Sequence, residues 1–338
     1  MTVTVSTEWS YNGIATVIIE NRLLRAVFMP GLGAKIWQLT YLPAGRDLLW
    51  HHPRIRPRPL PFHSTYDDVF FGGWDELFPN DAPEELSGER LPDHGEVWTL
   101  PWSFALERVT PDEVTLHLWV ETPISACRVE KWVTLRAGEA RLRFRHRIAN
   151  LGQQDQPFLW KLHPALAVDE HSRIDMGAEE VYVEDFGPPR NGRTGVTYRW
   201  PFLTDDSGRR HDMRRCLPIS ARVNEFQYAT RMSAGWCALT HTRERLGFGL
   251  AWEREVLPSC WIFASYGGWR NLQVAILEPC SGYPISVGDG VARGTHQVLA
   301  AGAELSCSVT AVVYEGLAGV AHIDADGGVT AAEEEVEP

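Results

Sequence analysis

Two segments place a proton-carrying side chain directly before a proline at the end of an apolar run. In 158–164, Phe-Leu-Trp-Lys-Leu-His-Pro, His163 shares one face of the expected strand with Lys161. In 272–279, Leu-Gln-Val-Ala-Ile-Leu-Glu-Pro, Glu278 follows the apolar positions Leu272, Val274 and Ile276 on one face of the expected strand. Each proline predicts a strand end, so both side chains are expected at a sheet rim. A histidine titrates near neutral pH and a carboxylate is costly to bury unpaired, so together they could transfer protons. A core histidine bonded to the backbone is the alternative for His163.

A third histidine lies in a turn-forming segment. His94 stands between Asp93 and Gly95, with Glu96 one residue further on. The neighbouring carboxylates favour the charged imidazole and would raise its pKa. A histidine exposed on a surface turn is the alternative interpretation. By itself, this segment is a weak indication of a site.

The sequence lacks the motifs of several other catalytic classes. His51 and His52 have no further ligands at regular spacing, and there is no HExxH or Cys/His zinc pattern. There is also no GxSxG elbow, P-loop or GxGxxG. The six cysteines form no CxxC pair, which indicates reduced, mostly buried thiols. We therefore expect no metal and no cofactor.

Alternation with a period of two residues dominates the elements that must position these groups. Between 140 and 148, Leu142, Phe144, His146 and Ile148 alternate with four arginines, as in a half-exposed antiparallel strand. Similar runs occur at Glu113–Val120, Cys127–Leu135, Leu246–Trp252, Leu272–Glu278 and Leu305–Tyr314. Turn-forming residues separate these runs, and no long amphipathic helix emerges. The pattern predicts an all-β fold of large antiparallel sheets packed face to face.

The chain shows no linker and no internal repeat, which favours a single domain over residues 1–330. The stretches Arg54–Leu91 and Phe186–Arg215 are expected to be long loops, and loops of this length usually cover or build a site. The final residues 331–338, Ala-Ala-Glu-Glu-Glu-Val-Glu-Pro, predict a disordered acidic tail.

Composition excludes several partner classes. Of 338 residues, 44% are hydrophobic and 22% charged, as in a globular protein with a substantial core. No stretch approaches the roughly 20 apolar residues that span a bilayer, so no membrane is expected. The N-terminus does not resemble a signal peptide, which favours a cytoplasmic location. A net charge of −12 argues against nucleic acid. The basic segment 51–58 is expected to be a solvated loop, with a polyanion site as the alternative.

Several short motifs, in order along most of the chain, resemble those of the galactose mutarotase-like superfamily, to which the aldose 1-epimerases belong. The matching segments are 21–27 with 30–36, Gly-Arg-Asp-Leu-Leu-Trp at 45–50, Gly-Gly-Trp-Asp-Glu-Leu-Phe-Pro-Asn at 72–80, Asp-His-Gly at 93–95, His-Pro at 163–164 and Leu-Glu-Pro at 277–279. The resemblance implies a β-supersandwich with a sugar site in a cleft.

The resemblance also implies catalytic roles. Glu278 matches the glutamate that acts as the base, and His163 matches the histidine that acts as the acid. His94 matches the histidine of the His-Gly motif and would steady the ring oxygen or an adjacent hydroxyl. Ring opening would remove a proton from the anomeric hydroxyl and deliver one to the ring oxygen, and reclosure would give the other anomer.

The resemblance identifies the sugar-binding residues less directly than the catalytic ones, because the chain departs from the family at these positions. The aldose 1-epimerases usually carry an arginine ahead of the first histidine. Here the corresponding region is 72–80, and its polar side chains could bind sugar hydroxyls, with a structural turn as the alternative. The candidates for substrate binding are Asp75, Glu76, Asn80, Lys161 and, for stacking on the sugar rather than core packing, Trp74 and Trp261. The family's hydroxyl-binding aspartate has no secure match; Asp185, Asp205, Asp206 and Asp212 are the open possibilities.

The expected function is interconversion of sugar anomers, with a small-molecule sugar substrate and a monomer or homodimer as the functional form. Another carbohydrate-processing enzyme on the same fold, such as a lyase, isomerase or glycoside-modifying enzyme, is one alternative. A non-catalytic sugar-binding protein is the other. The sequence leaves open which sugar is bound and whether it is phosphorylated or glycosidic.

Overall fold

The computed structural model describes residues 2–86 and 88–333 of the chain. The chain divides into two compact units, Met1–Pro164 with Cys280–Val309 and Ala165–Pro279 with Thr310–Pro338, which we call unit 1 and unit 2. Both are built mainly from antiparallel strands, so the predicted all-β class is confirmed. The single domain predicted over 1–330 stays a prediction.

The first strands of unit 1 form an antiparallel series in which each strand pairs with the next one named. These are β1 (Thr4–Ser6), β4 (Val17–Glu20), β5 (Leu24–Met29), β6 (Lys35–Tyr41), β8 (Trp74–Leu77) and β16 (Lys161–Leu166). Shorter additions are the hairpin of β2 (Ser10–Tyr11) with β3 (Ile14–Ala15), β7 (Arg46–Asp47) beside β6, and the 3-10 turns η1 (Leu42–Ala44) and η2 (Tyr66–Asp68).

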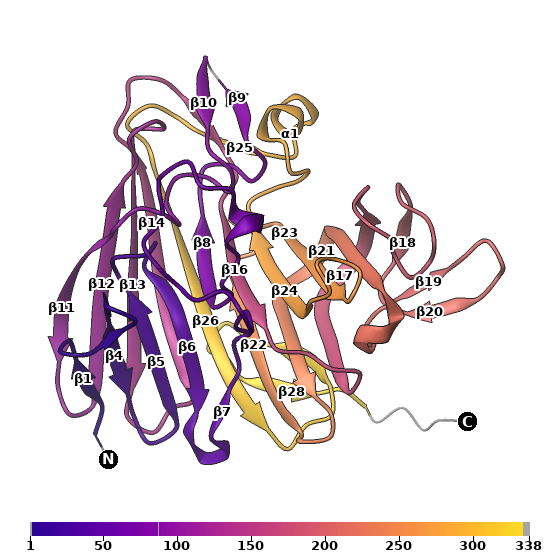
Figure 1. The fold of residues 1–338 in the computed structure, drawn as a ribbon, viewed down its shortest axis with the longest axis horizontal. Coiled ribbons are helices and arrows are strands. Elements are labelled where there is room, and N and C mark those ends of the chain that lie inside the picture. Colours follow the sequence, from indigo (N-terminus) through magenta and orange to yellow (C-terminus); the bar gives the residue numbers. More distant parts are fainter. Residues whose placement is uncertain (1, 87, 334–338) are drawn as a thin grey trace. The chain divides into compact units, whose positions relative to one another are not determined.

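A second antiparallel series in unit 1 contains the clearest alternating sequences, and its long strands lie side by side in Figure 1. Its members are β11 (Ser103–Val109), β12 (Glu113–Glu121), β13 (Cys127–Arg136) and β14 (Arg141–Asn150). In β14 the apolar positions are buried, and the arginines lie half-buried or exposed on the other face. Trp74 of β8 contacts Phe144 of β14, with ring centroids 5.1 Å apart, so the two series pack across an apolar layer.

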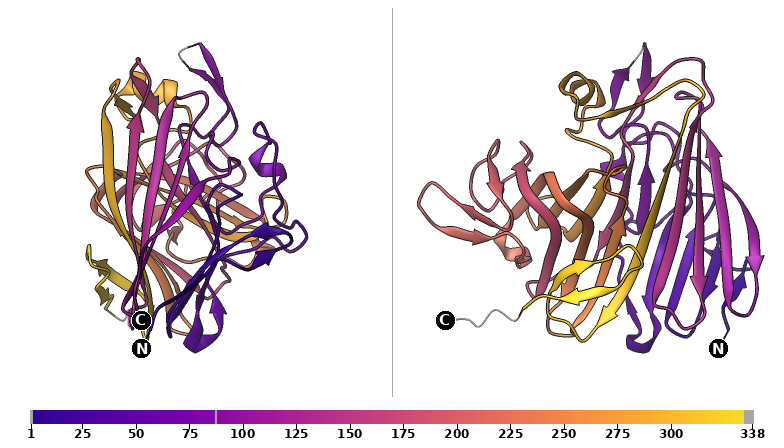
Figure 2. Two further views of the ribbon diagram at one scale, coloured as in Figure 1. Left: turned by 90° about the vertical axis from the view of Figure 1, so that its left-hand side faces the viewer. Right: turned by 180° about the vertical axis from the view of Figure 1, so that it is seen from behind.

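A hairpin and a short helix close one end of unit 1, where Figures 1 and 2 show them beside each other. The hairpin is β9 (Glu84–Leu86) with β10 (Glu89–Leu91), and the helix is α1 (Val287–Arg293). The Glu84 carboxylate accepts the backbone N–H groups of Val287 and Gly288, at 2.8 and 3.1 Å. It thereby satisfies donors that have no partner within the helix. Nearby, β15 (Gln156–Phe158) pairs with β25 (Gln297–Leu299).

The two longest strands of unit 2, β17 (Ser172–Val183) and β21 (Val223–His241), pair with each other. Its other elements are β18 (Thr197–Arg199), β19 (Phe202–Thr204), β20 (Arg210–Asp212), η3 (Ile219–Ala221), β22 (Leu246–Trp252), β23 (Ser259–Tyr266), β27 (Val320–Ile323) and β28 (Val329–Ala331). The boundaries between units fall within β16, β24 (Gln273–Cys280) and β26 (Glu304–Glu315).

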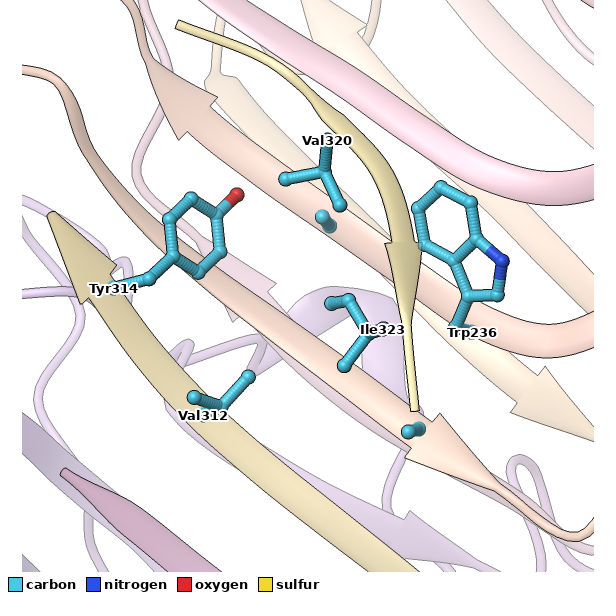
Figure 3. Packing of buried hydrophobic residues seen from close by; sticks show 7 residues of the cluster. Trp236, Val312, Tyr314, Val320 and Ile323 are labelled. Carbon is cyan, nitrogen blue, oxygen red and sulfur yellow. The ribbon is translucent and has the colours of Figure 1, made fainter. Parts of the chain in front are cut away.

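One apolar cluster of unit 2 joins four strands, β21, β22, β26 and β27. Val312 and Tyr314 from β26, Trp236 from β21, and Val320 and Ile323 from β27 point toward one another in Figure 3. The Tyr314 hydroxyl, which would be costly to bury alone, hydrogen-bonds with the Thr240 hydroxyl at 2.7 Å. Burial of such side chains stabilises a fold by roughly 1.5–3 kcal/mol each.

The alternating runs predicted as strands are confirmed to within one or two residues at each end. The predicted strand ends at the two prolines are wrong. β16 continues through Pro164 to Leu166, and β24 continues through Pro279 to Cys280. Proline lacks one donor, but its fixed φ is compatible with an extended strand, so pairing need not stop there. His163 and Glu278 therefore lie within strands.

The two predicted long loops contain strands of their own. Within 54–91 lie η2, β8, β9 and β10, and within 186–215 lie β18, β19 and β20. The alternation of the sequence did not predict β8. All four of its residues are buried, including two acids, so buried positions do not alternate with exposed ones.

No helix in the described part of the chain is long and apolar enough to cross a membrane. Of the predicted disordered tail, Ala331 belongs to β28, where it pairs with Val320. Residues 334–338 lie outside the described residues.

Candidate functional site

β8 and β16 divide the predicted site residues between two faces. The register places His163 opposite Asp75 and Leu162 opposite Glu76. Residues directly opposite each other in an antiparallel pair project from the same face, and neighbours along a strand project from opposite faces. His163 and Asp75 therefore share one face, while Glu76 belongs to the other.

A buried chain of polar contacts begins on the first face. Lys35 of β6 lies 2.5 Å from Asp75 Oδ2 through its Nζ atom and also donates to the carbonyl of Gly72 at 2.8 Å. The Tyr66 hydroxyl donates to the same Oδ2 at 2.7 Å and lies 3.1 Å from His163 Nδ1. All four of these side chains are at most 4% exposed. The hydroxyl of Tyr66 therefore connects the Lys35–Asp75 ion pair to His163.

His94 lies on a strained turn that packs against the end of β8. Its φ is +59°, a left-handed conformation that costs an ordinary residue about 1–3 kcal/mol and often marks functional positions. The next residue, Gly95, has a φ of +76°, and a Cβ there would lie 2.3 Å from the carbonyl oxygen of Phe78. Only glycine fits this close approach. A hydrogen bond of 2.6 Å from the backbone N–H of His94 to the carbonyl oxygen of Asp81 stabilises the turn.

The Tyr66 ring brings the two histidines together. His94 stacks on it at 4.1 Å between centroids with 7° between planes, and His163 meets it edge-on at 5.3 Å. The two imidazoles are 6.2 Å apart. Asp93 fixes the arrangement, since one carboxylate oxygen bonds His94 Nδ1 at 2.7 Å and the other accepts the Tyr66 N–H at 2.8 Å. The structure therefore places His94 and His163 in one cluster.

Lys161 adds a second buried ion pair on this side of unit 1. It binds Asp81, whose other oxygen lies 4.0 Å from His94 Nε2. The pKa of Asp81 is lowered, because the charges of Lys161 and His94 outweigh the opposing effect of burial. Asp81 thus remains a carboxylate beside His94.

The surroundings of the two histidines shift their pKa values in opposite directions. Burial lowers the pKa of His163 well below 6.5, and the nearby charges of Lys161, His94 and Lys35 lower it further. Burial also opposes the charged form of His94, but Asp81 and Asp93 outweigh it and raise its pKa above 6.5. At neutral pH the proton is therefore favoured on His94. The resemblance implied the reverse, with His163 as the protonated acid.

The other face of β8 belongs to the interior of unit 1. Glu76 pairs with Lys131 at 3.1 Å, accepts the Trp160 indole N–H at 3.0 Å and lies 3.6 Å from His146. Despite burial, the charges of Lys131 and His146 lower the pKa of Glu76. Trp74 packs on Phe144, as described above. These contacts place the two predicted sugar-binding residues away from the histidine pair.

Two further polar atoms are buried near the end of β8. Asp75 Oδ1 and Asn80 Oδ1 accept no hydrogen bond from the described residues. The Asn80 amide donates to the carbonyls of Ala82 and Pro92, at 2.8 and 2.7 Å, and so ties β8 to the turn that carries His94. Buried acceptors without a partner are uncommon and require an explanation, which a ligand hydroxyl could supply.

Unit 2 contains the remaining candidates. Glu278 lies on β24 and is 1% exposed. Trp261 has no exposed surface and packs on Phe226 and Tyr228, with centroids at 5.8 and 4.6 Å. The four candidate aspartates are held by local partners: Asp185 by Thr194, Asp205 by His211, Asp206 by Arg193 and Asp212 by Arg214.

Sequence reasoning missed Tyr66, Lys35, Asp81 and Lys131. The three buried carboxylates Asp75, Glu76 and Asp81 all come from the segment 74–81, and each pairs with a different lysine. A run of acids within an apolar segment was the available signal for buried counter-ions, because an unpaired carboxylate is costly to bury. Nothing local to Tyr66 indicated its position.

No group of three or more metal-ligating side chains occurs among residues 2–86 and 88–333. Unit 1 also has a cavity of about 370 Å³, and neither histidine of the pair lines it. Its lining includes Leu86, Glu89, Leu91, residues 124–126 and residues 152–156.

No protein-family model matches the sequence, and a search of curated proteins gives no match. Solved structures do match. A candidate aldose 1-epimerase from Klebsiella pneumoniae is 13% identical with a TM-score of 0.72, over 93% of this chain and 83% of that one. A galactose mutarotase-like protein from Clostridium acetobutylicum is 12% identical with a TM-score of 0.67, over 93% and 99%. The protein Slr1438 from Synechocystis is 19% identical with a TM-score of 0.65, over 93% and 100%. The chain therefore has the galactose mutarotase-like fold.

Proposed function

We propose that the protein is an acid–base enzyme of the aldose 1-epimerase type, which interconverts the α and β anomers of a sugar. The observation that carries the proposal is the pair of histidines around Tyr66, whose pKa values are moved in opposite directions. Two histidines whose pKa values are moved apart can hold different protonation states at one pH, so His94 can donate a proton while neutral His163 accepts a hydrogen bond from the sugar. The shared fold supports the choice of a sugar as substrate, although a fold alone does not determine an activity.

In the proposed mechanism, His94 is the proton donor of the resting enzyme. It protonates the ring oxygen while a carboxylate base, the role that the resemblance implies for Glu278, takes the proton of the anomeric hydroxyl. The bond between C1 and the ring oxygen breaks to give the open aldehyde. Rotation about the C1–C2 bond presents the other carbonyl face. As the ring closes, His94 takes its proton back from the hydroxyl that was the ring oxygen, and the base returns its proton to the carbonyl oxygen, so the reaction consumes no other reactant. Each positioned proton transfer contributes roughly 10²–10⁴-fold.

The remaining groups would bind the sugar hydroxyls. Neutral His163 would accept a hydrogen bond from one hydroxyl. Among the described residues, none donates to the buried Oδ1 atom of Asp75 or to that of Asn80, which supports their assignment as further acceptors. Lys161, paired with Asp81, would add a donor.

The decisive experiment is saturation-transfer NMR of anomeric exchange over a panel of aldoses. The wild-type protein is expected to accelerate exchange for at least one sugar, and Glu278→Gln is expected to abolish this while keeping the fold. Near-normal exchange in Glu278→Gln would remove Glu278 from the mechanism. A new ketone, alkene or cleaved glycoside would indicate a different carbohydrate enzyme, and sugar affinity without acceleration would indicate a binding protein.

A further inference from the structure

Tyr66 contacts both histidines of the site through different groups. Its ring stacks on His94, its hydroxyl contacts His163, and its backbone N–H binds the aspartate that holds His94. It lies at the start of η2 with its side chain buried, 3% exposed, so these contacts are fixed by packing. A residue in this position can control both imidazoles at once.

Counting protons along the buried chain assigns the tautomer of His163. The Asp75 carboxylate, paired with Lys35, can only accept, so the single hydroxyl proton of Tyr66 points at Asp75 Oδ2. The Tyr66 oxygen can then only accept from His163 Nδ1, 3.1 Å away. Nδ1 therefore carries the proton. In the neutral imidazole the lone pair is then on Nε2.

The same assignment of protons at His94 leaves Nε2 protonated, in contrast to Nε2 of His163. The Asp93 carboxylate can only accept, so the Nδ1 that it bonds at 2.7 Å also carries a proton. His94 Nε2 lies 4.0 Å from the Asp81 carboxylate, whose negative charge favours a second proton on the ring. Both histidines thus use Nδ1 for support, while Nε2 is a donor in His94 and an acceptor in His163.

We propose that Tyr66 is the positioning residue that makes the two histidines unequal, because its hydroxyl, anchored by the Lys35–Asp75 ion pair, holds the Nδ1–H tautomer of His163 while its ring fixes His94. Its effect on KM rests on the proposed function, whereas its effect on the tautomer does not. The role is comparable to that of the buried aspartate of a catalytic triad, which holds an imidazole in one tautomer. The charged groups around the pair in unit 1 are Lys35, Asp75, Asp81, Asp93 and Lys161.

The test is the tautomer of His163, read from the ring nitrogens of ¹⁵N-histidine-labelled protein and assigned by comparison with His163→Asn. The wild-type protein is expected to show a protonated Nδ1 and an unprotonated Nε2 at neutral pH. Tyr66→Phe keeps the ring on His94 and removes only the acceptor, so a mixture of the two neutral tautomers is expected. An Nε2–H tautomer in the wild type overturns the proposal, even if the variant does not fold. So does an unchanged Nδ1–H tautomer in a folded Tyr66→Phe.

Activity provides the second measurement. For a sugar that the wild type turns over, Tyr66→Phe should raise KM with kcat little changed, because the Nε2–H tautomer of His163 cannot accept the hydrogen bond of a sugar hydroxyl. A loss confined to kcat would overturn this role. The matched control is Tyr11→Phe, which removes a hydroxyl from an exposed tyrosine that packs on Trp37. If no sugar is turned over but the tautomers are as expected, the proposed function fails and the assignment of Tyr66 to the His163 tautomer stands.

Discussion

Unit 1 contains two histidines in nearly the same local setting, yet only one belongs to the candidate site. His94 stacks on Tyr66 at 4.1 Å and 7°, and His117 of β12 stacks on Trp132 at 4.3 Å and 5°. Each lies near two carboxylates, and their side chains are 15% and 13% exposed. A stacked, acid-flanked histidine is therefore not sufficient to identify a site.

The difference lies in what surrounds each pair. Around His117, the carboxylate of Glu130 also contacts Arg128 and Arg147, both far more exposed, and Arg145 covers Trp132. Around His94 the neighbours are a second histidine and two buried lysine–carboxylate pairs. Charges on a solvated face are screened, whereas buried charges alter pKa values strongly. The comparison suggests that burial of the network, more than the histidine itself, makes the site.

The largest expected effect is the loss of activity in His94→Gln. Removal of the proposed donor should lower the rate of anomer exchange by roughly 10²–10⁴-fold, the contribution of one positioned proton transfer. His117→Gln should leave the rate unchanged, because that histidine belongs to the solvated face. Polarimetry or exchange NMR would measure both. Equal rates in the two variants would contradict the distinction.

The next effect is on stability. Asp75→Ala leaves Lys35 buried without its counter-ion, so the free energy of unfolding should fall by about 3–5 kcal/mol. Glu113 is the matched control, because its partner Arg136 is 49% exposed. Glu113→Ala should cost at most about 1 kcal/mol. Denaturant titration of both variants would check this, and similar losses would show that burial is not the deciding factor.

The pH dependence of kcat/KM should show two limbs on opposite sides of 6.5. The pKa of His163 is lowered, so its neutral form is lost only as pH falls well below 6.5. The pKa of His94 is raised, so its proton is lost only as pH rises above 6.5. Activity should therefore be greatest between these limits. A profile of kcat/KM with a narrow maximum at pH 6.5 would contradict this prediction, because it would mean that both histidines have the pKa of an unperturbed imidazole.

The smallest effect is expected on the solvated face. Arg145 lies over the Trp132 ring at 3.9 Å. Arg145→Ala should cost about 0.5–1 kcal/mol of stability, as for an exposed cation–π contact, without changing activity. Thermal or chemical unfolding beside an activity assay would separate the two. An activity loss in this variant would connect the solvated face with the site.

Local alternation in the sequence was enough to identify the strand class and the main strand positions. β14 illustrates this, since its buried and exposed residues follow the alternation of its sequence. Periodicity reports burial on one face, and so it identified half-exposed strands well. It missed β8, which is buried on both faces and carries acids. It also gave wrong ends for β16 and β24, because proline was taken as a stop.

The sequence by itself determined that the protein is an antiparallel β structure and which residues are candidates to carry protons or bind the sugar: His94, His163, Glu278, Asp75 and Glu76. Only the tertiary structure decided the state of those groups. Asp75 meets a lysine 40 residues away and Asp81 one 80 residues away, while Tyr66 reaches a histidine 97 residues away. Protonation depends on burial and on the nearest charges in space, and neither is encoded by neighbours along the chain.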